Sequence, residues 1–252
     1  MEFAAYRGSC FVNMQQIDLE GERWMTLPLA EGLTLGVQTI HRRTEPSTGR
    51  WIPSLEDGRD VVELVDRLGF DSIWVGDHLA FSIPLLDPVV QLSQAAVFSN
   101  RLKIGTAVFL QPLRHPGPTA KQIATLDLLS NGRFIFGLGV GGEFESDFSV
   151  AGVPIAERGS RLSESIEVMR KLWSGQRVSH SGRHFQFEDI LMEPSPAQHG
   201  GPPIWLGGRS DAALRRAAQM ADGWMSYVVT PDMYRKSLDK IEIEYDRSGR
   251  AI

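Results

Sequence analysis

The sequence contains a single cysteine, Cys10, among its 252 residues. One cysteine excludes an internal disulfide, and it also excludes a metal or iron–sulfur centre held by several thiolates. Long apolar runs are absent as well, because no stretch approaches the roughly 20 residues that a membrane-spanning helix needs. Hydrophobic residues make up 42% of the chain, which is enough for one sizeable core.

Runs of basic residues are also missing. The formal net charge is −5 at pH 7, which argues against nucleic acid or an anionic membrane as the main partner. The N-terminal segment lacks the basic-then-apolar order of a signal peptide, because Asp18, Glu20 and Glu22 interrupt it. We therefore expect a cytoplasmic protein.

From Leu33 onward, short apolar runs alternate with amphipathic helical patterns. The predicted strands are Leu33–Val37, Phe70–Val75, Leu102–Val108, Phe134–Val140, Ile204–Leu206 and Gly223–Tyr227. The predicted helices cover residues 55–68, 87–99, 119–129, 157–173, 210–220 and 231–246, and Val178–Phe187 is expected to form an excursion or hairpin. Strands separated by helices pair in parallel, since only a crossover joins parallel neighbours. Two architectures fit this pattern, a barrel and a doubly wound open sheet.

The segment Trp74–His78 ends the second predicted strand. In a barrel, the carboxyl ends of the strands carry the chemistry. A histidine at that place, His78, can donate or accept a proton near neutral pH; the alternative is a structural bond to a neighbouring loop. Gly105, inside the third strand, also has a functional and a structural interpretation. It marks either a close approach of the backbone to a ligand or a glycine tolerated for packing.

Three glycines after the fourth strand, Gly137, Gly139 and Gly142, satisfy the spacing G-x-G-x-x-G. A dinucleotide-binding fingerprint would require a helix to begin there and would normally follow the first strand of its unit. No clean helix is expected, because Gly152 and Pro154 interrupt the segment after Phe144. The pattern fits better a strand end that lets a flat ring lie against the backbone, with Glu143 at its rim or simply solvated.

The segment Ile204–Ser210 places two glycines between a strand and a helix. Such a turn exposes backbone N–H groups at a helix N-terminus, and Arg209 and the Ser210 hydroxyl add further donors. These features predict a phosphate site. The alternative is that Ser210 caps the helix and Arg209 is solvated.

Two further pairs of residues are interpreted as structure. His180 and His184 have a spacing that could ligate a metal on a helix, but Ser181 and Gly182 favour a hairpin, so no metal site is expected. Arg158 and Arg161 begin the long helix, where the dipole disfavours cations. They serve either a ligand or an acidic neighbour, and ordinary ion pairing is favoured.

Taken together, these segments resemble the luciferase-like monooxygenase family in order and spacing. The resemblance covers about Leu33 to Asp246. It rests on the segments Phe70–His78, Gly105–Val108, Asn131–Arg133, Gly137–Gly141, Pro203–Ser210 and Ala221–Trp224. It implies a TIM-type (β/α) barrel that binds reduced FMN, or the related deazaflavin coenzyme, at its C-terminal mouth.

The resemblance also implies roles for individual residues. His78 would be the catalytic acid/base or polarising residue beside the ring, and Gly207 to Ser210 would hold the phosphate. The implied cofactor contacts are Asp77, Thr106, Gly139, Gly141, Gly142, Glu143, Gly207, Gly208, Arg209 and Ser210. The implied partners are the flavin, a small-molecule substrate and, in a homodimer, a second copy of the chain.

The sequence departs from the family at both ends. Family members continue past Asp246 into two more strand–helix units, so we expect a single barrel domain at 33–252 that lacks these units, with about six of eight strands present. A closed barrel of this type has eight strands, and six strands would leave the two edge strands of the sheet unpaired. We therefore expect a truncated product, or strands supplied by a partner. Residues 1–32 are expected to form an N-terminal extension, with Met25 a possible true start.

Four functions remain open from the sequence. The first is a monooxygenase that uses reduced FMN and oxygen on a small organic substrate. The second is a deazaflavin-dependent oxidoreductase that transfers hydride on the same fold. The third is a non-catalytic flavin-binding or truncated barrel protein, and the fourth is a Rossmann dehydrogenase that binds NAD.

Overall fold

The computed structural model describes residues 34–39, 54–81 and 85–250. The expected N-terminal extension at 1–32 lies outside these residues. The strands are β1 (Gly36–Thr39), β2 (Ser72–Val75), β3 (Lys103–Thr106), β4 (Phe134–Leu138), β5 (Val178–Ser181), β6 (Gln186–Ile190), β7 (Ile204–Gly207) and β8 (Gly223–Met225). The helices are α1 (Leu55–Arg67), α2 (Pro88–Phe98), α3 (Pro116–Leu129), α4 (Glu145–Ala151), α5 (Arg158–Leu172), α6 (Asp211–Met220) and α7 (Pro231–Ser248). Two short 3-10 helices, η2 (Gln111–Leu113) and η3 (Ile155–Glu157), complete the set for the described residues.

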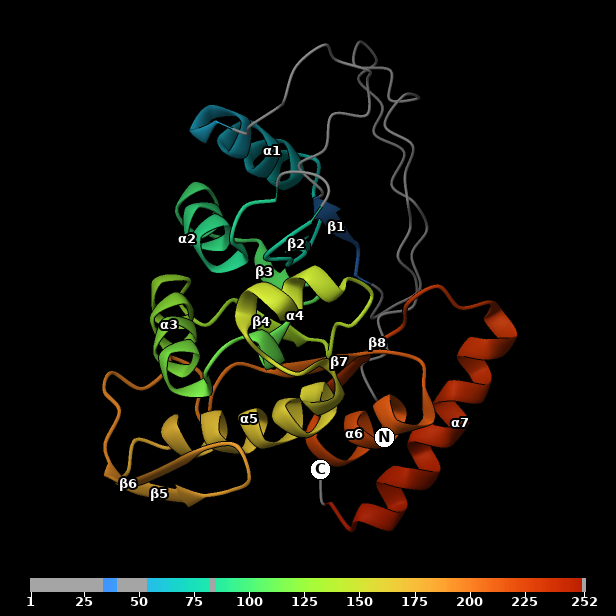
Figure 1. The fold of residues 1–252 in the computed structure, drawn as a ribbon. Coiled ribbons are helices and arrows are strands. Elements are labelled where there is room, and N and C mark those ends of the chain that lie inside the picture. The colour runs from blue at the N-terminus through green and yellow to red at the C-terminus, as the bar shows by residue number, and fades with distance from the viewer. Residues whose placement is uncertain (1–33, 40–53, 82–84, 251–252) are drawn as a thin grey trace.

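Six strands form one parallel sheet in the order β1-β2-β3-β4-β7-β8. The order follows the chain without a reversal, and the helices α1, α2, α3, α5, α6 and α7 each pack against the next around the sheet (Figure 1). A doubly wound sheet reverses its strand order at a switch point, so that alternative is wrong. The sheet is an incomplete barrel of six strands, as predicted, and within the described residues β1 and β8 are not paired with each other.

The local sequence explains where the helices begin. Ser54 caps α1 and forms a reciprocal capping box with Asp57, which satisfies two backbone N–H groups at the start of that helix. Asp87 caps α2, and its carboxylate accepts from the N–H groups of Val89 and Val90. Thr230 caps α7 in the same manner. Each cap replaces a lost backbone partner and stabilises its helix by about 1 kcal/mol.

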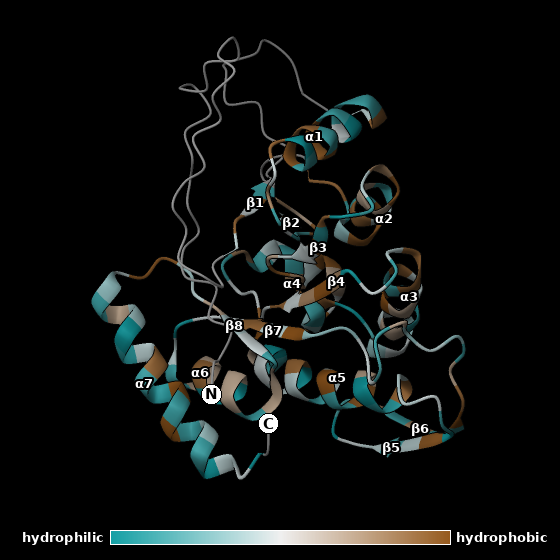
Figure 2. Ribbon diagram, turned by 180° about the vertical axis from the view of Figure 1, so that it is seen from behind, coloured by the Kyte–Doolittle hydropathy of each residue, from teal (hydrophilic) through white to brown (hydrophobic). Residues whose placement is uncertain are grey.

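The main core lies between the sheet and its helices. Alternate strand residues point to that side, among them Ile73 and Val75 of β2 and Phe134 and Phe136 of β4. Strands β4 and β7 are accordingly among the most hydrophobic segments, whereas α7 is mostly hydrophilic (Figure 2). Burial of such side chains supplies most of the folding free energy, at roughly 25 cal/mol per Å² of apolar surface.

The other face of the sheet carries a smaller cluster of Trp74, Ile135 and Trp205. The two indole rings lie 5.4 Å apart between centroids. A Cβ atom at Gly105 would lie 2.3 Å from Cζ3 of Trp74, so only glycine leaves room for this indole. Packing therefore accounts for Gly105, and the close approach comes from Trp74 rather than from a ligand.

Two segments outside the six-stranded sheet test the predictions: one has the expected structure, and the other contains a helix that was not expected. The polar stretch at 178–187 belongs to an antiparallel hairpin of β5 and β6, as predicted. The stretch after Gly142 was expected to contain no clean helix, but Glu145–Ala151 forms the short helix α4. Gly152 ends this helix in the left-handed region, with φ 65°, so the glycine that was interpreted as a helix breaker is its C-cap.

Candidate functional site

The predicted site residues gather at one edge of the sheet. The strands run parallel, so their carboxyl ends meet at the same edge. His78 follows the end of β2 by three residues, and Ser210 follows the end of β7 by three residues. Strands β3 and β4 separate β2 from β7, which spaces the two groups by roughly 14 Å at 4.8 Å per strand.

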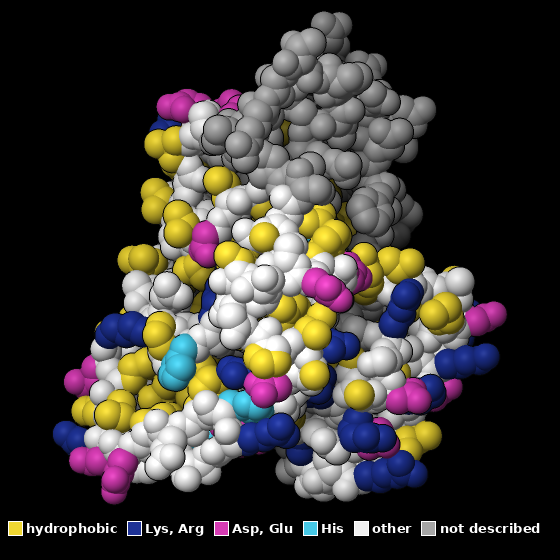
Figure 3. All heavy atoms as spheres, viewed as in Figure 1, with side chains coloured by type: hydrophobic (Ala, Val, Ile, Leu, Met, Phe, Trp, Pro, Cys, Tyr) yellow, Lys and Arg dark blue, Asp and Glu magenta, His cyan; other side chains and the backbone are white. Residues whose placement is uncertain are grey.

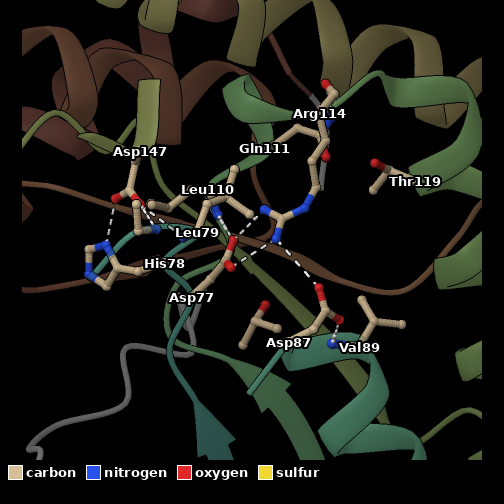
Figure 4. Close-up of polar contacts among 12 residues, drawn as sticks. Asp77, His78, Leu79, Asp87, Val89, Leu110, Gln111, Arg114, Thr119 and Asp147 are labelled. Carbon is tan, nitrogen blue, oxygen red and sulfur yellow. Dashed lines mark hydrogen bonds and ion pairs between the residues drawn. The ribbon is translucent and has the colours of Figure 1, made fainter. Parts of the chain in front are cut away.

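Three neighbouring side chains hold His78, namely Asp147, Phe81 and Phe144; Figure 4 shows its contact with Asp147. Its Nδ1 atom lies 2.7 Å from Oδ2 of Asp147. The ring stacks on Phe81 with 4.4 Å between centroids and 10° between planes, and Phe144 meets it edge-on at 5.2 Å. The side chain keeps 23% of its surface exposed. Among the residues that the structure describes, Nε2 has no hydrogen-bond or ion-pair partner, so this nitrogen can bond a ligand.

Asp147 comes from α4 and lies almost entirely out of solvent, with a side chain 2% exposed. Its Oδ1 atom accepts hydrogen bonds from the backbone N–H groups of Leu79 and Ala80, both at 2.8 Å. Burial alone would raise the pKa of this carboxyl, but the bonds from His78, Ala80 and Leu79 outweigh it and hold the pKa below its ordinary value. Asp147 is therefore an anion at neutral pH.

Sequence reasoning missed Asp147. The segment around it was expected to contain no clean helix, because Gly152 and Pro154 interrupt it. The pairing joins residues 69 positions apart, and no local spacing reports such a contact. The acidic first turn of α4, with Glu145 and Asp147 just beyond the fourth strand, is the one local signal that pointed to it.

Asp77 is also buried, at 3% exposure, and its two oxygens are engaged within the protein. Oδ2 accepts from Leu110 N at 2.9 Å and Arg114 Nη1 at 2.5 Å, and Oδ1 accepts from Arg114 Nη2 at 2.9 Å. Arg114 also lies 3.6 Å from Asp87 and over the ring of Phe109. This network fixes the loop that carries His78, and the predicted contact of Asp77 with a cofactor stays a prediction.

Three of the residues predicted to contact the cofactor, Thr106, Gly139 and Gly207, have contacts within the protein. Thr106 is fully buried and donates from Oγ1 to the carbonyl oxygen of Gly137 at 2.7 Å, so its hydroxyl braces β3 against β4. Val108 lies two residues further on and packs against two glycines with predicted cofactor contacts, Gly139 for the ring and Gly207 for the phosphate. A Cβ atom at Gly139 would lie 2.4 Å from Cγ2 of Val108, and one at Gly207 would lie 3.0 Å from Cγ1. These glycines therefore make room for Val108 and leave their backbones on the edge of the sheet.

The turn after β4 holds three more predicted contacts. Gly141 and Gly142 both have positive φ angles, 64° and 107°, a conformation that only glycine adopts without strain. Glu143 is exposed. The guanidinium of Arg158 lies beside Gly142, with Nε 3.0 Å from the place a Cβ would take. Arg158 thus brings a positive charge to this turn, whereas Arg161 pairs with Glu157 at 2.8 Å.

The turn after β7 has the outline of an anion site together with a capped helix. Gly208 has a φ of 131°, and the Ser210 hydroxyl accepts from Ala213 N at 3.3 Å and caps α6. Arg209 is exposed and donates to the carbonyl oxygen of Val228 at 2.8 Å. The structural alternative for Ser210 is therefore present, and the predicted phosphate contact remains compatible with it. Ser210 bonds the N–H groups of Ala213 and Leu214, and the remaining N–H groups of the first turn of α6 are donors of the kind that a phosphate requires.

The two histidines of the hairpin form a separate cluster. His180 Nε2 lies 3.3 Å from Glu164, and His184 Nε2 lies 2.9 Å from Ser160 Oγ. The backbone N–H groups of His184 and Phe185 also bond Glu164. Among the described residues, no three metal-ligating side chains come together.

A family model described as luciferase-like monooxygenase matches residues 34–252. The oxygenase component of a flavin-dependent trigonelline monooxygenase of Acinetobacter baylyi is 31% identical over 162 residues, which cover 64% of this chain and 45% of that protein. An F420-dependent glucose-6-phosphate dehydrogenase of Microbacterium testaceum is 30% identical over 201 residues, which cover 74% of this chain and 57% of that protein. The chain thus spans about half the length of these curated relatives.

Solved structures give the same fold. A monooxygenase of Streptomyces bottropensis superposes with a TM-score of 0.71 and 26% identity over 79% of this chain and 61% of the other. An F420-dependent secondary alcohol dehydrogenase superposes with a TM-score of 0.71 over 78% of this chain and 62% of the other, at 22% identity. In the part of the chain that the structure describes, no helix is long and apolar enough to span a membrane.

Proposed function

The chain belongs to the luciferase-like monooxygenase family, and from that premise we propose that it is an oxidoreductase that uses reduced FMN and oxygen on a small organic substrate. The observation that carries this proposal is the placement of His78 with its Asp147 partner and of the Gly207–Ser210 turn at the same edge of one parallel sheet. His78 and the Gly207–Ser210 turn lie far enough apart for the flavin ring to reach the histidine while the phosphate reaches the turn.

The residues at this edge fit FMN in shape and in charge. The Trp74–Trp205 pair forms a floor on the inner face of the sheet. Above it, Gly139 and Gly207 present backbone without side chains of their own, next to the side chain of Val108. The helix N-terminus at Ser210, together with Arg209, would hold the phosphate, with Arg158 as a second cation near Gly142. The remaining predicted contacts, at Gly141, Gly142 and Glu143, would line the rim.

When bound, the flavin supplies the redox chemistry, which no amino-acid side chain can supply. The protein contributes positioning and a proton acceptor. His78 lies on the β2 side with Nε2 as its available atom, where a proton can move to or from a substrate. Phe81 and Phe144 surround the imidazole with apolar surface, which excludes water from that side of the ring.

The second candidate is hydride transfer with a deazaflavin. It is supported by the F420-dependent relative of Microbacterium testaceum, which aligns over more of this chain than the trigonelline monooxygenase component does. To separate the two, the purified chain would be titrated with each cofactor and the fluorescence followed. Oxygen uptake with reduced FMN supports the monooxygenase. Binding of the deazaflavin alone, without oxygen uptake, supports hydride transfer.

The third candidate, a non-catalytic flavin-binding protein, makes a different prediction. A His78→Ala variant would then leave all measurable behaviour unchanged. If turnover falls by more than about 100-fold while cofactor affinity holds, a non-catalytic role is excluded. The fourth candidate, a Rossmann dehydrogenase, has no support in the strand order described above.

We also propose a homodimer. Helices α2 and α3 expose Val90, Val97 and Leu129 at 70%, 76% and 65%, and hydrophobic side chains line the side of the molecule on which these helices lie (Figure 3). Charged side chains gather instead around α6 and α7. Exposed apolar residues on neighbouring helices are typical of an interface. Sedimentation equilibrium would test the dimer, and a Val97→Glu variant would weaken it if α2 takes part.

A further inference from the structure

Four contacts fasten the loop after β2 to the start of α4. Asp147 Oδ2 contacts His78 Nδ1, and Asp147 Oδ1 accepts from the N–H groups of Leu79 and Ala80. In addition, Ser146 Oγ donates to the carbonyl oxygen of Ala80 at 2.8 Å. The two oxygens of Asp147 thus have separate partners among the described residues: Oδ1 bonds backbone N–H groups, and Oδ2 bonds the imidazole.

The charge of Asp147 decides which nitrogen of His78 carries the proton. An ionised carboxylate accepts hydrogen bonds and cannot donate one. The contact of 2.7 Å between Oδ2 and Nδ1 therefore requires a proton on Nδ1. A neutral imidazole carries one proton, so Nε2 is left with a lone pair.

Packing fixes the ring in this orientation as well. Phe81 covers one face of the imidazole at a 10° interplanar angle, and Phe144 closes on its edge. A half-turn of the ring would place a carbon against the buried carboxylate and leave that charge without a partner, which is costly. The orientation and the tautomer are therefore determined together.

We propose that Asp147 is the positioning residue for His78. It holds the imidazole with Nδ1 protonated, so that Nε2 is the atom that takes up a proton from the substrate. After that transfer, the proton stays on Nε2 and the carboxylate stabilises the imidazolium. Asp147 acts through His78 and does not itself touch the cofactor. The catalytic part of this inference rests on the proposed oxidoreductase function, whereas the tautomer does not.

The substitution Asp147→Asn tests the proposal with little change in shape. Its Oδ1 can keep both backbone bonds to Leu79 and Ala80, while its amide nitrogen would face His78 Nδ1 as a donor. The tautomer with Nδ1 unprotonated is then favoured. Two control variants are Ser146→Ala, which loosens the loop without touching the imidazole, and Glu145→Gln, which removes an exposed carboxylate from the same turn.

The measurement is imidazole nitrogen NMR on the full chain with ¹⁵N-labelled histidine, at a pH of about 8.5, above the ordinary range of histidine pKa values. A His78→Gln variant assigns the signal. We expect the Nδ1–H tautomer to exceed the other by about tenfold or more in the wild type, because a charge-assisted bond favours it. In Asp147→Asn the ratio of the Nδ1–H to the Nε2–H tautomer falls by at least about tenfold, and in both controls this ratio is the same as in the wild type.

A wild-type spectrum dominated by the Nε2–H tautomer would overturn the proposal, even if the variant failed to fold. An unchanged ratio in a folded Asp147→Asn variant would do the same. With the holoenzyme, kcat of Asp147→Asn should fall by about 100-fold, with KM and cofactor affinity held. If neither flavin nor deazaflavin binds, the proposed function fails while the tautomer result stands.

Discussion

The two sides of the site edge are built in opposite ways. On the β2 side, Asp77 and Asp147 are buried carboxylates whose oxygens are occupied by Arg114, His78 and backbone N–H groups. On the β7 side, the turn at Gly207 and Gly208 is partly exposed, and Arg209 donates to the carbonyl oxygen of Val228. The first side has its polar partners inside the protein, whereas on the second side the first N–H groups of α6 lie at an exposed turn that a ligand can reach.

In the proposed function, this difference corresponds to two roles, proton transfer on the β2 side and phosphate binding on the β7 side. A proton-transfer group needs one fixed orientation, and bonds within the protein supply it before any ligand arrives. A phosphate group instead needs donors without internal partners, since those donors must bond the ligand. Substitutions on the β2 side should therefore change stability or turnover, and substitutions on the β7 side should change affinity.

The largest effect is expected from Asp77→Ala. This change leaves the Arg114 guanidinium, 18% exposed, without its bidentate partner, and it leaves Leu110 N without an acceptor. Removal of one partner from a buried pair costs about 3 to 5 kcal/mol. Urea unfolding would measure this loss in the free energy of unfolding. As a control, Asp232→Ala breaks a solvent-exposed pair with Arg235 and should cost no more than about 0.5 kcal/mol. Similar losses in both variants would contradict the buried network.

The next effect is expected from His78→Ala. Turnover should fall by about 100-fold, the ordinary contribution of a general acid or base, while cofactor affinity changes less than about twofold. Steady-state kinetics together with a fluorescence titration measure both quantities. A parallel loss of affinity would mean that His78 holds the cofactor rather than the proton, and the division between the two sides would fail.

The sequence predicted the scaffold well because its signals are local. Alternating apolar runs and helical stripes report strands and helices, and strands joined by helices must run parallel. The placement of His78 and Ser210 at the same edge of the sheet follows from that alone. The six strands and the hairpin at 178–187 were confirmed for this reason.

The side-chain pairings could not be predicted in the same way. Asp147 meets His78 across 69 positions, and Arg114 meets Asp77 across 37. Such contacts depend on how far each loop extends beyond its strand, and no spacing rule states that. Glycines show the same limit. Gly105 was open to two interpretations, and only the position of the Trp74 indole decides between them.

A smaller effect is expected from Arg209→Ala. Removing a charge at the helix N-terminus should weaken FMN by about tenfold, since an exposed charge-assisted bond to phosphate contributes on the order of 1.5 kcal/mol. Riboflavin, which lacks the phosphate, is the matched ligand and should bind equally to both proteins. Fluorescence quenching of each flavin measures the two affinities. An equal loss for riboflavin would move Arg209 away from the phosphate and leave the turn without its proposed ligand.

The smallest effect is a pH dependence confined to acid. The pKa of Asp147 is held below its ordinary value of 3.8 by its bonds from His78, Ala80 and Leu79, against the opposing effect of burial. A depressed carboxyl pKa stabilises the fold above the unfolded value, and this stabilisation is lost as the pH falls through the folded value. Stability of the wild type should therefore decline below about pH 4 more steeply than that of Asp147→Asn, and urea unfolding from pH 3 to 6 would show the two curves converging. Glu145→Gln, on the same turn but exposed, should follow the wild type. Curves that stay parallel would mean that Asp147 carries no depressed pKa, and the charge on which the orientation of His78 depends would be absent.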